Sequence, residues 1–191
     1  MSAASDYQQA VRLLTKPLPA YVTYTQRGHV RMDAIEKDIN ETVTVRTSDG
    51  KTVKGKELEI YTGAGSKTSG NILKNSPFET SCYTGLSSKP DTYDGRAVEA
   101  IALKDVCKRD KDDGDFKTMY VDPASHDPVA VVGRGGEDPV FVSFEQRYVR
   151  AGAYVVPDLL AVRVKGSGLM FWLDFDFHAA FTDYSFSDKA P

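Results

Sequence analysis

The chain has 191 residues, of which 41% are apolar and 27% are charged, and its formal net charge at pH 7 is −3. This composition is ordinary for a globular protein, and the length predicts one domain that spans residues 1–191. The slightly acidic balance argues against nonspecific nucleic-acid binding, which needs a concentrated basic surface. No stretch approaches the roughly 20 consecutive apolar residues of a membrane-spanning helix, so we expect no transmembrane segment.

The first residues, Met1 to Tyr7, carry neither the basic region nor the apolar region of a secretory signal peptide. We therefore expect either a cytosolic protein or a chain that begins after a removed signal. Ser5 to Lys16 predicts the only clear helix, with Ser5 as its N-cap. Its apolar residues, Tyr7 and Leu14 among them, recur at helical spacing on one face, and Pro17 ends it.

The next segments alternate between apolar and polar residues and are rich in Tyr, Val and Thr, which predicts strands. We expect strands at Ala20 to Met32, Ile39 to Arg46 and Thr52 to Tyr61, with a tight turn at Ser48 to Gly50. Gly63 to Asp94 is instead rich in Gly, Ser, Lys, Thr and Pro, and predicts a long excursion with at most one short helix. Loops of this length are usually functional or mobile. A plain solvated linker is the alternative.

The second half of the chain predicts a run of antiparallel strands with short turns. They are Arg96 to Cys107, Phe116 to Asp122, Val129 to Val132, Pro139 to Val149, Tyr154 to Lys165 and Leu169 to His178. The whole pattern predicts an α+β fold, mainly β, in which eight or nine strands form a curved antiparallel meander sheet with the N-terminal helix packed on it.

The last two strands also predict their own register. If Gly166 to Gly168 contains a two-residue hairpin loop, Val164 lies opposite Phe171 and apolar faces apolar. The same register places Arg163 opposite Trp172, where a cation–π contact would form.

The strand before them changes its inward parity along its length. Tyr148 would face Val155 across the preceding turn, whereas even-numbered residues face inward from Leu160 onward. One extra residue must be absorbed near Pro157 to Leu160, which predicts a β-bulge and hence a bent sheet.

The two cysteines, Cys82 and Cys107, have two open interpretations. If they are oxidised, they close a loop of roughly 25 residues and stabilise the fold by about 3 kcal/mol. The alternative is two unrelated free thiols.

Possible catalytic or metal-binding patterns are weak. Asp174, Asp176 and His178 alternate on one strand face and could ligate a metal, although the solvated face of a strand is the simpler interpretation. Asp110 to Asp115 has the composition of a calcium loop, but Gly114 takes the fifth position, where an oxygen ligand is needed. No nucleophile–base spacing is present. We therefore expect no enzyme activity and no cofactor.

The segment Phe116 to Val129 resembles the strand–Val-Asp-Pro-x-Ser/Thr-x-x-Pro-Val–strand unit of the lipoprotein-carrier (LolA/LolB-like) superfamily, and Val156-Pro157 and the order of elements are also similar. The resemblance implies an unclosed β-barrel with a helix-covered concave face that takes acyl chains or other apolar ligands. It also implies a periplasmic or cell-envelope location, which would supply the missing signal peptide and favour a Cys82–Cys107 disulfide.

These observations predict a non-enzymatic cell-envelope module, a monomer, that binds a lipid, a lipoprotein acyl chain or another apolar ligand. The first alternative is a structural or protein-interaction domain of the envelope with a solid core. A metal-dependent enzyme that uses Asp174, Asp176 and His178 is a minor alternative. The candidate ligand-binding residues are Leu14, Val142, Phe144, Leu160, Val162, Phe171, Leu173 and Phe175.

Overall fold

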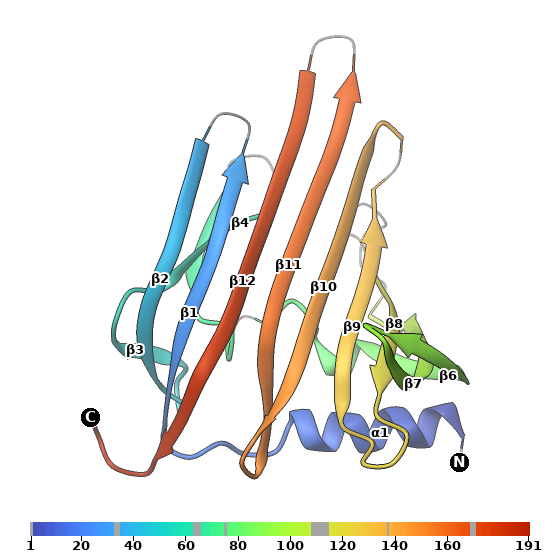
Figure 1. The fold of residues 1–191 in the computed structure, drawn as a ribbon, viewed down its shortest axis with the longest axis horizontal. Coiled ribbons are helices and arrows are strands. Elements are labelled where there is room, and N and C mark those ends of the chain that lie inside the picture. The colour runs from blue at the N-terminus through green and yellow to red at the C-terminus, as the bar shows by residue number, and fades with distance from the viewer. Residues whose placement is uncertain are drawn as a thin grey trace.

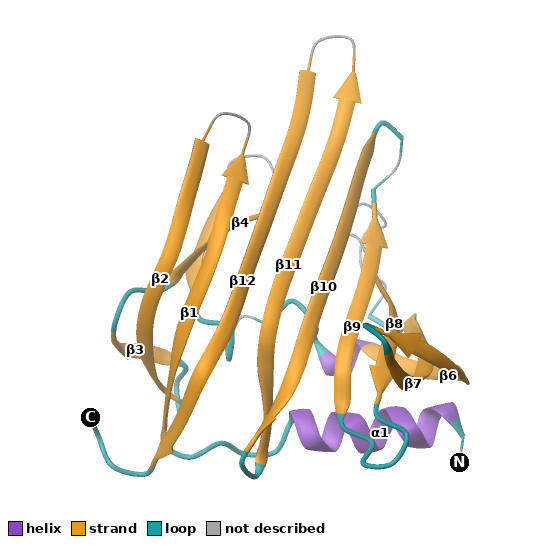
Figure 2. Cartoon of the chain, in the orientation of Figure 1, coloured by secondary structure: helices purple, strands orange, loops and turns teal. Residues whose placement is uncertain are grey.

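The protein is a strongly curved antiparallel sheet with one helix on it. The computed structural model describes residues 2–32, 35–62, 66–74, 76–107, 115–136, 138–168 and 171–191. Ten strands form the main sheet in the order β3-β2-β1-β12-β11-β10-β9-β8-β7-β6, and β4 and β5 form a second, two-stranded sheet (Figures 1 and 2). All strand pairs in the main sheet are antiparallel, and the sheet stays open because its edge strands β3 and β6 do not pair with each other in the described chain. The predicted mainly β fold, an unclosed curved sheet with a packed helix, is confirmed.

The elements follow the chain closely. They are α1 (Ala3–Leu14), β1 (Tyr21–Met32), β2 (Ile35–Arg46), β3 (Lys51–Lys54), β4 (Leu58–Thr62), β5 (Ser66–Gly70), the 3₁₀ turn η1 (Thr80–Cys82), β6 (Tyr83–Tyr93), β7 (Arg96–Asp105), β8 (Asp115–Val121), β9 (Pro128–Gly135), β10 (Val140–Ala151), β11 (Tyr154–Gly168) and β12 (Phe171–Ser187). None of the helices in the described ranges is long and apolar enough to cross a membrane.

The helix begins two residues earlier than its sequence predicts. Ser2, not Ser5, is the N-cap, and its side-chain oxygen accepts a hydrogen bond from the backbone N–H of Ser5 at 3.3 Å. Both serines are good N-cap residues, and the earlier start adds Ala3 to the buried face that Tyr7 and Ala10 form.

The predicted third strand, Thr52 to Tyr61, is wrong, because it divides into β3 and β4. Between them Gly55 has a φ of +84°, a left-handed conformation that favours glycine and turns the chain. The predicted excursion from Gly63 to Asp94 is also only partly right. It contains β5 and η1, and its last third is the edge strand β6. The polar composition and Pro90 of β6 suit a sheet edge, where they discourage pairing with other chains.

The C-terminal strands confirm the predicted bulge and correct the predicted registers. Tyr148 pairs with Pro157 and Arg147 with Leu159, so Asp158 is the extra residue of β11. Between β11 and β12, Val164 pairs with Phe175 rather than Phe171, and the link at 169–170 lies outside the described residues.

The predicted contact between Arg163 and Trp172 is also wrong, because Arg163 has a different partner. Arg163 lies opposite Asp176, and its guanidinium donates two hydrogen bonds to one carboxylate oxygen, at 3.0 and 2.8 Å. The side chain of Trp172 lies outside the described part of the chain, as does most of the predicted polar turn at Asp110 to Asp115.

Two buried clusters form the core, and each lies over a different group of strands. The first joins α1 to β7, β8 and β9 through residues such as Tyr7, Ile101 and Met119. The second lies on β1, β2, β11 and β12 and includes Tyr24 and Phe181. A disulfide between Cys82 and Cys107 fastens η1 to the end of β7, which confirms the oxidised interpretation.

Candidate functional site

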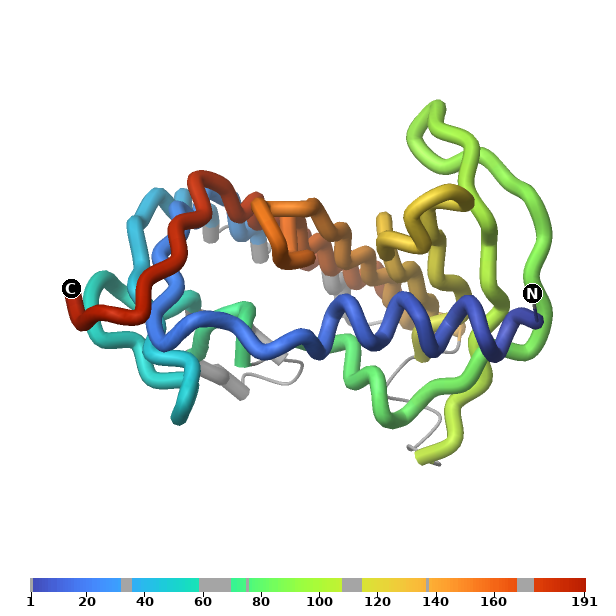
Figure 3. Tube along the Cα trace, turned by 90° about the horizontal axis from the view of Figure 1, so that it is seen from below, coloured from blue at the N-terminus to red at the C-terminus, as the bar shows by residue number. Residues whose placement is uncertain are grey.

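The two faces of the sheet differ in chemistry. We call the face that carries α1 the inner face and the opposite one the outer face. Figure 3 shows α1 and the chain that follows it running along one side of the curved sheet. Across the central strands, Phe144, Val162 and Phe177 lie on the inner face in one register row. The intervening positions, such as Arg163 and Asp176, point to the outer face and form an exposed ion pair.

The inner face contains the predicted ligand-binding residues whose side chains are described, but they are not equivalent. Leu160 and Phe175 are buried, at 1% and 7% exposure, within the second core cluster. Leu14 packs against the first cluster at the end of α1. Only Val142, Phe144 and Val162 remain half-buried on the sheet itself. The side chains of Phe171 and Leu173 lie outside the described part of the chain.

We define the apolar strip as Val142, Phe144, Val162 and Val164. The register pairs Val142 with Val164 and Phe144 with Val162, so the four side chains form two adjacent rows on β10 and β11. All four are half-buried. Phe144 borders the first core cluster, whereas Val162 and Val164 border the second, so the strip lies along the seam between the two clusters.

The helix α1 lies at the end of β10 and β11 that is farther from the apolar strip. Figure 1 shows α1 crossing one end of the sheet, and it contacts β6, β7, β9 and β11. On β10 the residue near α1 is Tyr148, whose pKa is raised by burial and by the nearby Tyr7. Burial also raises the pKa of Tyr7, so both hydroxyls stay neutral. The hydroxyl of Tyr7 donates to the carbonyl oxygen of Thr80 at 2.7 Å.

Between the strip and α1 lies one fully buried polar side chain, Gln146. Its Oε1 accepts a hydrogen bond from the hydroxyl of Ser76 at 3.0 Å, which brings the segment before Phe78 onto the inner face. Its Nε2 is shielded from solvent and has no hydrogen-bond partner among the residues that the structure describes. The strip is therefore bounded on the α1 side by a buried amide.

Beyond the strip, the same register row runs through buried residues to a small hollow on the inner face. Phe177 pairs with Val162 on one side and with Val30 on the other. Val30 lines a hollow of about 270 Å³ between β1, β2 and the chain that leads into β4. Leu58 forms part of its wall, and Gln26 lies at its base with its Nε2 donating to the carbonyl oxygen of Lys56 at 3.0 Å.

Sequence patterns missed part of this arrangement. Val164 could have been found, because it shares the strand and parity of Val162. Gln146 also shares the strand and parity of Phe144, but its burial depends on contact with the distant Ser76. Val30 and Gln26 could not have been found, because their place beside the strip depends on the pairing of β1 with β12.

The two carboxylates among the candidate metal ligands of β12, Asp174 and Asp176, are already engaged by arginines, whereas His178 is exposed on the same strand. Asp176 binds Arg163, and Asp174 accepts a hydrogen bond from Arg31 at 3.2 Å. Within the described residues no three His, Cys, Asp or Glu side chains come together as a metal site. The arrangement instead stabilises the exposed outer face of the sheet through ion pairs.

Comparison with solved structures identifies the architecture. A domain from Vibrio parahaemolyticus, provisionally identified as an outer membrane lipoprotein-sorting protein, superposes with a TM-score of 0.56 at 11% identity, covering 99% of this chain and 95% of its own. The chain has a LolA-like fold. A DUF1329 family protein from Desulfovibrio piger gives the same TM-score at 9% identity, covering 100% of this chain and 96% of its own. No protein-family model and no curated protein sequence matches the chain.

Proposed function

We propose that this LolA-like protein is a non-enzymatic binding module that holds a lipid or lipoprotein acyl chain on its inner face. The observation that carries the proposal is the apolar strip. Four neighbouring apolar side chains on the helix-covered face remain half-buried at the end of β10 and β11 that α1 does not cover. An antiparallel sheet commonly packs its apolar face on the core of the protein. An apolar face that the protein itself covers only in part therefore suits a removable ligand.

The ligand would bind by removing apolar surface from water. Each Å² of apolar area that leaves water contributes about 25 cal/mol, so a chain that lies along the strip gains affinity in proportion to its length. The register row continues from Val162 through Phe177 to Val30, but these last two side chains are buried, at 1% and 7% exposure. The apolar surface open to an acyl chain is therefore the strip itself.

The compartment we infer is the periplasm or another part of the cell envelope. The Cys82–Cys107 disulfide supports an oxidising compartment, because such bonds persist outside the cytosol. The solved domain with the same fold that was identified with outer membrane lipoprotein sorting supports it independently.

The first experiment asks whether the purified protein carries a ligand. Organic extraction followed by mass spectrometry is expected to find acyl chains in the purified protein. A dansyl-labelled fatty acid is then expected to bind with increased fluorescence and to be displaced by unlabelled fatty acids, more tightly as the chain lengthens. No acyl chains together with no saturable probe binding would contradict the proposal and would favour a protein-interaction domain with a solid core.

A matched pair of variants places the site. Val164→Lys introduces a charge into the strip and is expected to weaken probe binding at least tenfold, because covering the charged lysine head group with an acyl chain would remove it from water. Val149→Lys makes the same change on β10 at an exposed position outside the strip, and its binding is expected to equal that of the wild type. Circular dichroism of both variants separates lost binding from lost folding. Equal binding by both variants would mean that the ligand binds outside the strip.

A further inference from the structure

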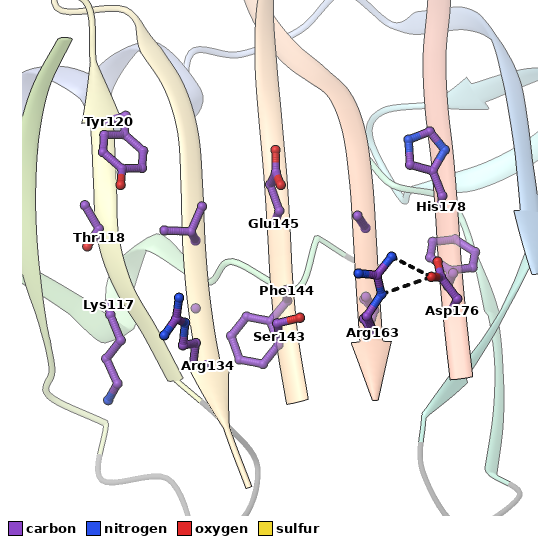
Figure 4. A pocket seen from close by; sticks show the side chains of 15 residues that line it. Lys117, Thr118, Tyr120, Arg134, Ser143, Phe144, Glu145, Arg163, Asp176 and His178 are labelled. Atoms are coloured by element: carbon purple, nitrogen blue, oxygen red, sulfur yellow. Dashed lines mark hydrogen bonds and ion pairs between the residues drawn. The ribbon is translucent and has the colours of Figure 1, made fainter. Parts of the chain in front are cut away.

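The outer face carries a larger hollow that the acyl-binding proposal does not use. Its volume is about 690 Å³, within the range of small-ligand pockets, and it lies over β8 to β12. Figure 4 shows its side chains standing on neighbouring strands, with Arg134, Ser143 and Arg163 in one row. The strand register gives the same row, because Arg134 pairs with Ser143 and Ser143 with Arg163.

The β6–β7 hairpin contacts two residues that line this hollow, Tyr120 and Glu145. The ring of Tyr93, at the tip of the hairpin, stacks on Tyr120 with ring centroids 4.6 Å apart. The hydroxyl of Tyr93 donates to the carboxylate of Glu145, and Arg147 forms an ion pair with Asp94 at 3.5 Å. Three separate contacts therefore hold the hairpin against the outer face beside the hollow.

The acidic side chains around the hollow are already paired. Glu145 accepts the hydrogen bond from Tyr93, and Asp176 holds Arg163 through a single oxygen. Asp115, the register neighbour of Arg134, binds Lys117 at 2.6 Å instead. Each of these carboxylates is therefore engaged by a residue other than the remaining cation of the hollow.

Arg134 is that cation. Its guanidinium has no carboxylate within 4 Å among the described residues, and the hydroxyl of Ser143 has no hydrogen-bond partner there. Arg163 uses its Nε and one terminal nitrogen on Asp176, which leaves the other terminal nitrogen available. Two strand spacings separate Arg134 from Arg163, about 10 Å between their Cα atoms, so both side chains can reach one group placed over Ser143.

We propose that the outer hollow binds a small hydroxylated organic anion whose oxyanionic group, a carboxylate or a phosphate, lies over Ser143 between Arg134 and Arg163. Guanidinium groups bind such oxyanions with paired, charge-assisted hydrogen bonds. Thr118, Glu145 and His178, one row along the strands, offer donors and acceptors to the ligand hydroxyls. Phe144 and Val162 of the strip also line this hollow, but the side chains that would hold the anion, Arg134, Ser143 and Arg163, lie on the outer face. Either proposal can therefore fail alone.

The test is an NMR titration of the isotope-labelled protein with three probes, namely glucose 6-phosphate, glucuronate and uncharged glucose. At least one of the two anions is expected to produce saturable shifts of the backbone amides of Arg134, Ser143 and Arg163 below about 10 mM, an affinity typical of a weak small-ligand site. Glucose is expected to bind about tenfold more weakly, and higher salt is expected to reduce anion binding.

Two charge-matched variants complete the test. Arg134→Gln is expected to weaken anion binding about tenfold, the loss expected for one charge-assisted hydrogen bond. Arg27→Gln removes the same charge from an exposed position on β1, outside the hollow, and is expected to leave binding unchanged. Equal losses in both variants, equal affinity for glucose, or no saturable shift with either anion would overturn the proposal. Binding to phosphatidylglycerol vesicles without binding of either soluble anion would also overturn it, because the partner would then be a membrane surface.

Discussion

The ring of Phe144 lies directly over the backbone of Gly133 on the neighbouring strand. A β-carbon at Gly133 would overlap two carbons of that ring and would come within 2.6 Å of the carbonyl oxygen of Asp115. From this position the ring reaches Phe116, with ring centroids 4.8 Å apart. The glycine therefore decides where the largest side chain of the apolar strip lies.

Replacing this glycine is expected to displace the ring. Gly133→Ala should lower the free energy of unfolding by about 1–3 kcal/mol, the usual cost of forcing extra atoms into a packed region. It should also weaken binding of the dansyl fatty acid. In a Phe144→Ala background the further cost of Gly133→Ala should shrink by more than about 0.5 kcal/mol, because only the crowding at Asp115 remains. Urea denaturation of the four proteins measures this coupling, and strictly additive losses would contradict it.

The buried amide of Gln146 leads to a prediction of unusual sign. Its unpaired Nε2 costs about 1–3 kcal/mol of desolvation, which roughly offsets what its single hydrogen bond to Ser76 contributes. Gln146→Leu should therefore leave the free energy of unfolding within about 1 kcal/mol of the wild type, or raise it. Gln146→Ala should lower it by about 2 kcal/mol, because a cavity remains. Equal losses in the two variants, measured by urea denaturation, would show that the amide is fully hydrogen-bonded in solution.

Removal of the disulfide should destabilise the fold without changing it. Cys82 and Cys107 are separated by 25 residues, a loop whose closure in the unfolded chain is worth about 3 kcal/mol. The double variant Cys82→Ser, Cys107→Ser should lose about that much stability, and the wild type should lose the same amount in reducing agent. Thermal unfolding with and without dithiothreitol measures both effects. The prediction would be contradicted if dithiothreitol left the thermal stability of the wild type unchanged although thiol titration showed that the disulfide was fully reduced.

The turn after β8 should make stability depend on pH. The carboxylate of Asp122 accepts hydrogen bonds from the backbone N–H groups of Ser125 and Ala124, each at 2.9 Å, and these lower its pKa below the ordinary value. A lowered pKa in the folded state stabilises the protein above the unfolded value of about 3.9, and this contribution disappears as the pH falls through the folded value. Asp122→Asn should therefore be less stable than the wild type near neutral pH.

The same variant supplies the pH control. Below the folded-state pKa the wild-type carboxyl is protonated, so the difference in unfolding free energy between Asp122→Asn and the wild type should shrink. Urea denaturation at about pH 7 and about pH 3 tests this. A difference that stays constant across that range would mean that the carboxylate does not carry the stabilisation.

The sequence predicted the faces of the strands better than their offsets. Alternation assigns a residue to a face, but a slide of two residues on each strand preserves that assignment. The β11–β12 hairpin moved in this way, so that Val164 meets Phe175 and apolar still faces apolar. Gly166 was interpreted as part of the turn, yet it lies within β11, where its bare Cα allows Val140 and Pro139 to approach closely.

Burial was predictable only where it depended on the strand alone. Leu160 and Phe175 lie on the same predicted inward face as Val142 and Val162, and the pattern treats all four alike. The second core cluster covers the first two, through contacts with residues more than a hundred positions earlier in the chain such as Val22 and Tyr24. Periodicity contains no information about such cover. For the same reason the polar edge strand β6 was interpreted as a loop, because its single partner strand leaves most of its side chains in water.

The antiparallel pairing of β1 with β12 places the chain's first and last strands side by side in the middle of the sheet, with Tyr21 opposite Ser187. During synthesis on the ribosome, β1 and β11 are both made before β12, the strand that pairs with each of them. Until β12 emerges, the nascent chain has two unsatisfied interior edges that could recruit other copies. A chain that lacks β12 would therefore have two unjoined halves prone to aggregation, and the sheet becomes continuous only when β12 pairs with both β1 and β11.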